Sequence, residues 1–445
     1  MNYIIQESIK ELKLYNAKKR EKHIEKLLDY YNGNNTTHYI SKMFSAAVFN
    51  EIPLTEVNIT RRFINKMSRI YTIGANRNVG ERYDDLTILK PARMKHVERM
   101  TRLGGTLATR VVWNEGDSPY FDYRPVYFFH VFFDDDPFVP TAITYPILQP
   151  VEDSSKIEKL QYAYWDAEKY VHMDEDGDIM AEIPHTYGVL PFVFTHRENQ
   201  TDSFYVEGAN DIINANEHVN IAMTEMQLGL RFQMFGQPVM TGAEMGNNQR
   251  TGSDVTLELP EGSTYDIVAP AGNVAGVIEN IKFLVELVAQ NNHLWVHWSE
   301  QGGEVPSGIS MMIKDLERTE DYQDDLALWN MYEEDIYRVE RKIASSFGVS
   351  LPDDLGLDFK EPEYPKTVQD QILWDKHRLE MNLIDEVGLL MEYNQDLTLE
   401  QAELTIASNK QRNEKLSIFE KARQAAERTA PVQAGIAGQN NGLPR

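Results

Sequence analysis

Hydrophobic residues recur at helical spacing in three long segments in the second half of this 445-residue chain. The spacing predicts helices over 210–235, 274–298 and 308–347, the last of roughly forty residues and far longer than an ordinary globular helix. Each of the first two carries a continuous apolar stripe. The stripes consist of Ile212, Ile213, Val219, Met223, Met226 and Leu230 on the first helix, and of Ile278, Ile281, Val285 and Val288, widened by Phe283, Leu284 and Leu287, on the second.

Two glycine-containing segments interrupt this series of helices. Between the first two helices, residues 236–270 hold five glycines around short runs, such as 255–259, that alternate as strands do. After the second helix, residues 299–307 contain the adjacent Gly302 and Gly303, and then Pro306. We predict a small separate β or α/β element for the first segment and a flexible loop for the second.

The first two hundred residues change from a helical period to a period of two. Helices are predicted over 3–31, 59–73 and 91–103, with Gly74 placed to end the second. From 107 onward the alternation predicts strands over 107–113, 126–133, 142–145, 161–165, 169–172 and 190–194, and the Asp-Gly pair at 176–177 predicts a hairpin turn. We therefore expect an antiparallel β region packed on helices, and an α+β fold class.

The C-terminal part is predicted to be helical. A short strand is expected at 357–359, followed by helices over 367–393 and 398–427. Thr398 and Gln401 have the spacing of a capping box, in which each side chain bonds the other residue's backbone amide. The end of the chain is rich in Gly, Pro and Gln, and we predict a disordered tail over 426–445.

Composition limits the class of protein. The chain is too long for one compact core, so two or more domains are expected. No apolar run is long enough to span a bilayer, and the N-terminus lacks the features of a signal peptide. The chain has no cysteine, which excludes disulfides, thiolate metal sites and cysteine nucleophiles. These features predict a soluble protein made in a reducing cytoplasm.

The net charge of −25 is unevenly distributed. Residues 1–110 hold 20 Lys and Arg against 11 Asp and Glu, residues 111–300 hold 8 against 30, and residues 301–445 hold 16 against 28. An acidic protein does not bind DNA by neutralising phosphates, although an acidic wall could surround DNA without binding it. We favour the simpler interpretation, in which the charge serves solubility and attraction between the basic part of one subunit and the acidic part of another.

Three groups of residues resemble metal sites, and each is better explained by structure. Asp174, Asp176 and Asp178 begin like a calcium loop, but the glycine is misplaced and His185 stands where a glutamate belongs, so we predict a turn. The run 134–136 of three aspartates before a proline is also typical of a turn.

His293 and His297 have zinc-ligand spacing on a helix, but no glutamate lies beside the first histidine, and we predict packing or interface roles. Phosphate-loop and nucleophile-elbow motifs are absent from the sequence. No catalytic residue, metal or cofactor is therefore predicted, and we do not expect an enzyme.

In the order of its elements, the chain from about residue 25 to 425 resembles the portal protein of tailed bacteriophages, the ring that connects head and tail. The most specific pieces are the segments 205–211 (YVEGAND), 306–310 (PSGIS) and 185–192 (HTYGVLPF). The resemblance implies a β-rich wing over 1–205, stem helices over 206–235 and 271–298, and a clip over 236–270. It further implies a tunnel loop over 299–307, a long wing-crossing helix and return to the wing over 308–365, and a helical crown over 366–425.

The resemblance also implies site residues, none of them catalytic. The channel constriction would be formed by Glu300, Gln301, Gly302, Gly303, Glu304, Val305 and Pro306. Docking of the packaging motor and of the tail would involve Gly242, Glu244, Asn247, Asn248 and Arg250 in the clip.

The implied function is structural. Copies of the chain would form a ring, usually of twelve subunits, at one capsid vertex of a virion assembled in the host bacterial cytoplasm. Its partners would be double-stranded DNA in the channel, a separate terminase motor, capsid or scaffolding protein and a tail adaptor, with no membrane. Two alternatives remain open: a non-viral helical scaffold or adaptor, and an enzyme with a metal at 134–136 or at the histidine pair.

Overall fold

The computed structural model describes residues 9–13, 15–45, 53–148, 160–235, 237–241, 262, 264–268, 273–296, 316–360, 368–394 and 397–429. The chain forms two compact units. The first consists of residues 1–305 and 311–363, and the second of residues 306–310 and 364–445. The structure mixes helix and sheet, as the α+β fold class requires.

Short and medium helices begin the first unit. They are α2 (Tyr15–Asn32), α3 (Thr36–Ser41), α5 (Ile59–Met67), α6 (Ile70–Ile73), α7 (Glu81–Leu86) and α8 (Lys90–Gly104). The helix predicted over 59–73 is wrong as one piece, because the chain leaves helical geometry at Ser68. A glutamate distant in sequence caps the new start: Glu98 accepts hydrogen bonds from the amides of Ile70 and Tyr71, at 3.0 Å each. Gly74 ends α6 with φ of 117°, as predicted.

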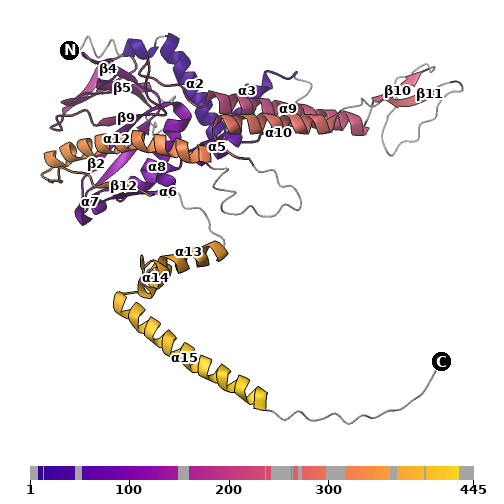
Figure 1. Cartoon of the computed structure of the whole chain (residues 1–445). Coiled ribbons are helices and arrows are strands. Elements are labelled where there is room, and N and C mark those ends of the chain that lie inside the picture. The colour runs from indigo at the N-terminus through magenta and orange to yellow at the C-terminus, as the bar shows by residue number, and fades with distance from the viewer. Residues whose placement is uncertain are drawn as a thin grey trace. The chain divides into compact units, whose positions relative to one another are not determined.

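Two antiparallel sheets follow, and Figure 1 shows them beside the N-terminal helices. One has the order β3-β2-β9, formed by β2 (Thr106–Asn114), β3 (Tyr120–Val126) and β9 (Phe192–His196). The other has the order β4-β5-β6-β7-β8, formed by β4 (His130–Phe133), β5 (Pro140–Leu148), β6 (Leu160–Trp165), β7 (Lys169–Met173) and β8 (Ile179–Pro184). The predicted antiparallel region is thus divided into two sheets.

The strand predicted over 126–133 is wrong as one piece. Residues up to Val126 belong to β3 and residues from His130 belong to β4, so the aromatic run passes from one sheet to the other. Between them Phe129 is buried, and its carbonyl accepts a hydrogen bond from Arg20 Nη2 at 2.7 Å. The sequence cannot show where such a change of sheet occurs, because a continuous apolar run has no alternation that would mark the end of a strand.

A pair of long helices extends from this body, and a small hairpin lies at its far end (Figure 1). The pair is α9 (Asn210–Phe235) and α10 (Val274–Asn291), and the hairpin is β10 (Gln237–Thr241) with β11 (Thr264–Val268). The prediction for α9 is confirmed to the residue. The predicted strand 255–259 lies outside the described residues.

The second helix ends seven residues before its predicted end at 298. His293 adopts a left-handed φ of 51°, its amide bonds the carbonyl of Gln290, and the amide of Leu294 bonds the carbonyl of Ala289. This is the Schellman arrangement, with the left-handed position filled by histidine. Helical spacing continued past this point in the sequence, so the stop was not visible there.

The chain then returns along α12 (Leu316–Ser346), which Figure 1 shows crossing the body beside the sheets. The first part of the helix predicted from 308 lies outside the described residues. After α12, β12 (Leu357–Phe359) confirms the predicted short strand and pairs with β1 (Ala75–Arg77), which the sequence did not indicate. The largest apolar cluster joins residues of α2, α5, α8, β2, β3, α9, α10 and α12 in one core.

The second unit contains α13 (Val368–Glu380), α14 (Glu386–Tyr393) and α15 (Leu399–Thr429). The single helix predicted over 367–393 is wrong: Asn382 adopts φ of 55°, and Asp385 starts a new helix by accepting from the amide of Gly388. The capping box is confirmed, with Thr398 and Gln401 bonding each other's amides at 3.1 and 3.4 Å. Residues 426–429 are helical rather than part of a tail, and residues 430–445 lie outside the described residues.

Candidate functional site

The site residues implied by the resemblance lie outside the described residues. This holds for Glu300 to Pro306 of the loop and for Gly242, Glu244, Asn247, Asn248 and Arg250 of the clip. Those assignments stay predictions. The described parts next to them are the helix pair α9 and α10, its attachment to the body, and the hairpin of β10 and β11.

The helix pair has two different outer faces. On α10, Val285, Val288 and Ala289 are buried, whereas Phe283 and Leu287 on the opposite face are 60% and 42% exposed. On α9 the exposed positions at helical spacing are polar: Asp211, Asn214, His218 and Glu225. The outer surface of α10 thus combines two large exposed apolar side chains with the polar Glu279, Asn280 and Gln290. Such a mixed surface is typical of one that another subunit contacts, whereas the polar surface of α9 is suited to water.

A line of polar side chains on α9 fixes the helix to the body. The side chains of Asn216, Asn220 and Thr224, all buried, accept hydrogen bonds from the backbone amides of 59 and 60, of 57 and of 55 respectively, at 2.8 to 3.1 Å. Asn216 also donates to the carbonyl of Val57 at 2.7 Å. Four helical residues rise about 6 Å, and two extended residues rise about 6.6 Å, so the two repeats match.

The start of α9 packs closely on the junction between α8 and β2. Gly208 lies so near that a Cβ there would meet the carbonyl oxygen of Leu103 at 2.3 Å. Gly105 on the other side has φ of 81°, and its Cβ would meet the carbonyl oxygen of Val206 at 2.2 Å. The amide of Ala209 bonds the same Leu103 carbonyl at 2.9 Å. The segment 205–211 therefore needs its glycine for close backbone contact.

Arg20 of α2 contacts Tyr205, five residues before α9 begins. The guanidinium of Arg20 lies 3.7 Å from the ring centroid of Tyr205, within range of a cation–π interaction. Lys26 of the same helix pairs with Glu217 of α9 at 2.7 Å, and Tyr30 donates to that carboxylate at 3.0 Å. Basic residues near the N-terminus thus fix α9 directly.

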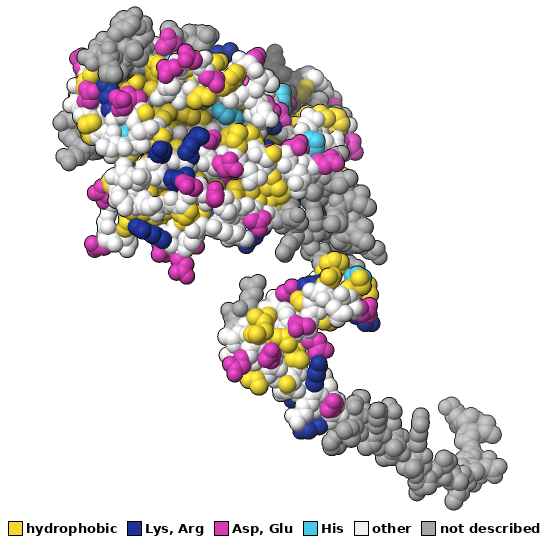
Figure 2. Space-filling view, turned by 60° about the vertical axis from the view of Figure 1, so that its left-hand side comes forward, with side chains coloured by type: hydrophobic (Ala, Val, Ile, Leu, Met, Phe, Trp, Pro, Cys, Tyr) yellow, Lys and Arg dark blue, Asp and Glu magenta, His cyan; other side chains and the backbone are white. Residues whose placement is uncertain are grey.

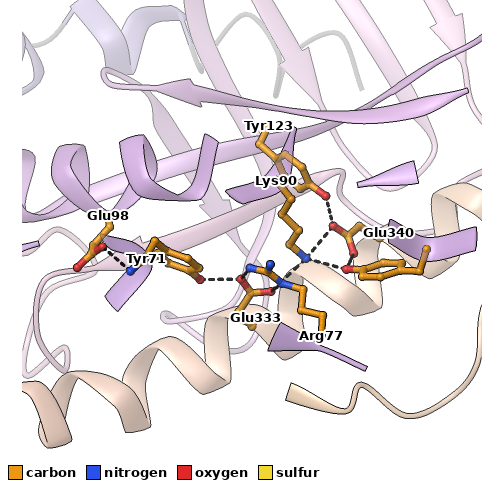
Figure 3. A network of polar contacts seen from close by, with 8 residues as sticks. Tyr71, Arg77, Lys90, Glu98, Tyr123, Glu333 and Glu340 are labelled. Carbon is orange, nitrogen blue, oxygen red and sulfur yellow. Dashed lines mark hydrogen bonds and ion pairs between the residues drawn. The ribbon is translucent and has the colours of Figure 1, made fainter. Parts of the chain in front are cut away.

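A network of buried charges joins α12 to the body (Figure 3). Lys90 is fully buried and pairs with Glu333 at 3.1 Å and with Glu340 at 2.9 Å. Arg77 Nε donates to Glu333 at 3.0 Å, so two cations face two carboxylates. Three tyrosine hydroxyls complete the set: Tyr71 donates to Glu333, and Tyr83 and Tyr123 donate to Glu340.

The electrostatics of this network are those of a structural site. Burial would raise the pKa of Glu333, but Lys90 and Arg77 outweigh it and hold the pKa at about 2. Burial and the neighbouring glutamates raise the pKa of Tyr71, Tyr83 and Tyr123, so their hydroxyls keep their protons and donate. The charges balance and the carboxylates are fully hydrogen-bonded, which a buried ion pair needs in order to be tolerated.

The candidate metal residues do not converge in the described part of the chain. The backbone amide of Phe138 bonds the Asp136 side chain at 2.9 Å, as in a turn. The Asp174 side chain accepts from the amides of Asp176 and Asp178, and Gly177 has φ of 90°, which confirms the predicted turn. No group of three His, Asp or Glu residues placed to bind a metal occurs among the described residues.

The histidine pair does not share a helix. Since α10 ends at Asn291, His293 lies beyond the helix that was predicted to carry both histidines. His293 lies 3.8 Å from Asp321 of the segment that begins α12. His297 lies outside the described residues.

The sequence analysis predicted neither the buried charge network nor the line of buried polar side chains on α9. Glu333 and Glu340 are seven residues apart on the same face as the buried Trp329, Ile336 and Ile343, so they interrupt an apolar stripe. Asn216, Asn220 and Thr224 likewise recur every four residues beside an apolar stripe. In both helices, polar residues recur at the spacing of the buried face, and this recurrence in the sequence could have indicated that they are buried.

Comparison with known proteins adds little. No model of a protein family matches the sequence, and no curated protein matches it. The structure is similar to a chain from the virion of a native gene transfer agent particle, with 9% identity and a TM-score of 0.34, over 73% of this chain and 85% of that chain. A similarity of this extent does not establish a shared fold. None of the described helices is long and apolar enough to span a bilayer.

Proposed function

We propose that this chain is a portal protein, a non-enzymatic subunit of a ring at one capsid vertex. The observation that supports the proposal is the order of elements around the helix pair. An α+β body is followed by a long helix, a hairpin, a second antiparallel long helix and then a helix that crosses the body. That order agrees with the order of wing, stem, clip, stem and wing-crossing helix that the sequence resemblance implies.

The two outer faces of the helix pair fit a ring. Phe283 and Leu287 would be covered by the neighbouring copy, because large exposed apolar side chains commonly mark a surface that another protein covers. The polar face with Asp211, Asn214, His218 and Glu225 would remain wet and face the channel. A duplex would then pass a polar, net acidic wall without binding to it.

The remaining partners follow from the same proposal. A ring, of twelve subunits as in the family, would let a separate terminase motor move double-stranded DNA inward through the channel and later let the DNA leave. The motor and then the tail adaptor would dock on the clip, and capsid or scaffolding protein would contact the wing. The alternative is a helical scaffold that does not form closed rings.

The first test is the oligomeric state of the purified full chain. We expect closed rings with a central channel in electron micrographs and a matching mass in analytical ultracentrifugation. Phe283→Glu/Leu287→Glu should convert rings to monomers with unchanged circular dichroism. The matched pair Asn214→Glu/His218→Glu, on the polar face of α9, should leave the rings intact. A wild-type chain that stays monomeric or dimeric across protein and salt concentrations would contradict the proposal.

A further inference from the structure

The described part of the second unit has almost no buried side chains. Among the side chains of α13–α15 whose burial is described, only Asp375 and Ala402 are buried. Large apolar side chains stay exposed instead: Ile372, Leu373, Met381, Leu383, Leu399 and Leu404 are 59% to 71% exposed. Figure 2 shows hydrophobic and acidic side chains together on one face of this unit. Exposed apolar side chains gathered among polar ones are typical of a surface that another protein covers.

Polar contacts hold the three helices together in place of an apolar core. Arg378 of α13 forms two hydrogen bonds to Glu392 of α14, at 2.6 and 2.9 Å, and Tyr393 donates to Asp375 at 2.5 Å. Lys410 of α15 pairs with Glu386 at the start of α14, at 2.5 Å. These contacts place α14 against the first half of α15.

Charge is separated along the same unit. Residues 368–403 contain nine acidic and two basic residues, whereas residues 404–429 contain three acidic and six basic residues. Among the exposed positions, Glu380, Glu400 and Glu403 lie in the acidic part, and Arg412 and Lys415 lie in the basic part. The unit therefore has an acidic, apolar beginning and a basic end.

Within one chain, Lys410 of the basic end reaches Glu386, but the rest of the basic end lies beyond that contact. Helix α15 is continuous to Thr429, so its last nineteen residues extend about 28 Å beyond Lys410, where contact with α14 occurs. Figure 1 shows α15 projecting past α13 and α14 within this unit. A second copy of the chain can bring a basic end to an acidic beginning.

We propose that the second unit binds a second copy of itself head to tail, with the basic part of α15 covering the acidic and apolar surface of α13 and of the start of α15 in the neighbour. Such a contact joins two different surfaces, so it repeats around a ring instead of stopping at a dimer. This inference rests on the proposed ring function and names a contact within it. The attraction involves exposed charges and is therefore screened by salt.

The absence of cysteine permits a direct test with the full-length chain. Leu373→Cys places one thiol on α13 and Ala425→Cys places one on distal α15. Equal amounts of the two variants are mixed and treated with a short bis-maleimide. Any covalent dimer that needs both variants is intermolecular and head to tail. We expect the mixture to give at least fivefold more dimer than either variant alone, and 0.5 M NaCl to reduce the yield.

Charge reversals make the test specific. Arg412→Glu/Lys415→Glu in the Ala425→Cys chain should lower the yield about fivefold, and Glu380→Lys/Glu403→Lys in the Leu373→Cys chain should restore it. Arg82→Glu/Lys342→Glu, which reverses the same amount of charge on the first unit, should change nothing.

Equal dimer yield in mixed and unmixed samples would overturn the head-to-tail contact. It would also be overturned if Arg82→Glu/Lys342→Glu lowered the dimer yield as much as Arg412→Glu/Lys415→Glu does. Micrographs of the same samples keep the two proposals apart. Rings without cross-linked dimers reject only this contact, and cross-linked dimers without rings reject only the portal function.

Discussion

At the scale of single residues, the buried network around Lys90 permits a sharp prediction. Lys90→Met keeps the approximate shape of the side chain but leaves Glu333 and Glu340 with one cation fewer inside the protein. Breaking a buried pair on one side leaves an uncompensated charge, so we expect a loss of about 3–5 kcal/mol in the free energy of unfolding. Urea denaturation measures it, and a loss below about 1 kcal/mol would contradict this account. The exposed Lys342→Met should change stability by less than about 0.5 kcal/mol.

Glu98 gives a prediction on pH. Burial raises its pKa from 4.5 to about 7 against the opposing effect of the amides of Tyr71 and Ile70 and of Arg102. A carboxyl whose pKa is raised in the folded state stabilises the fold fully below pH 4.5, and this contribution is lost as the pH rises through about 7.

In Glu98→Gln that pH-dependent contribution is absent. The free energy of unfolding of the variant minus that of the wild type should therefore rise by about 3 kcal/mol between pH 4.5 and pH 7. Denaturation at several pH values measures this difference. A difference that is constant over this range would show that Glu98 is already ionised in the folded protein.

At the scale of elements, the hydrogen bonds that fix α9 to the body can be tested separately from the stability of the helix itself. Asn216→Ala removes the partner of the Ile59 and Thr60 amides and of the Val57 carbonyl. Buried groups left without partners cost about 1–3 kcal/mol each, and we expect a loss of at least 2 kcal/mol in the free energy of unfolding. Asn214→Ala, two residues earlier and exposed, should be neutral or slightly stabilising because alanine favours helix. If the two variants lost the same free energy of unfolding, the buried polar side chains of α9 would not be what fixes the helix to the body.

At the scale of the whole molecule, the loop over 299–307 provides a test of passage that is separate from assembly. The loop lies outside the described residues; if it lines the constriction of the proposed ring, we expect its two adjacent glycines to let it act as a soft gate. We then expect two variants, Gly302→Val/Gly303→Val and Glu304→Lys, to form rings but to package or retain less DNA. In the second variant, lysine would attract the DNA phosphates that glutamate repels. Packaging and retention at wild-type levels in both variants would reject the gate and leave the ring proposal standing.

The sequence by itself determined the kinds of elements and their order. Helical and alternating periods report which side chains share a face, and that information is local, so α9, α8, the capping box at Thr398 and the turn at Asp174 were all predictable. The tertiary structure decided where elements stop and what holds them. Helix α6 begins where Glu98 caps it, the run 126–133 changes sheet where Phe129 is buried, and α10 ends in the left-handed turn at His293.

The buried charges show the same difference between what the sequence determines and what only the tertiary structure decides. The sequence places Glu333 and Glu340 on an apolar stripe, but it does not show which partners would make their burial possible, and a charge is costly to bury alone. Only the fold brings two cations, two carboxylates and three tyrosines within hydrogen-bonding distance, and only then does their burial become tolerable. Periodicity is a property of a segment, whereas partners come from parts of the chain that are distant in sequence, and for that reason the structure was needed to find them.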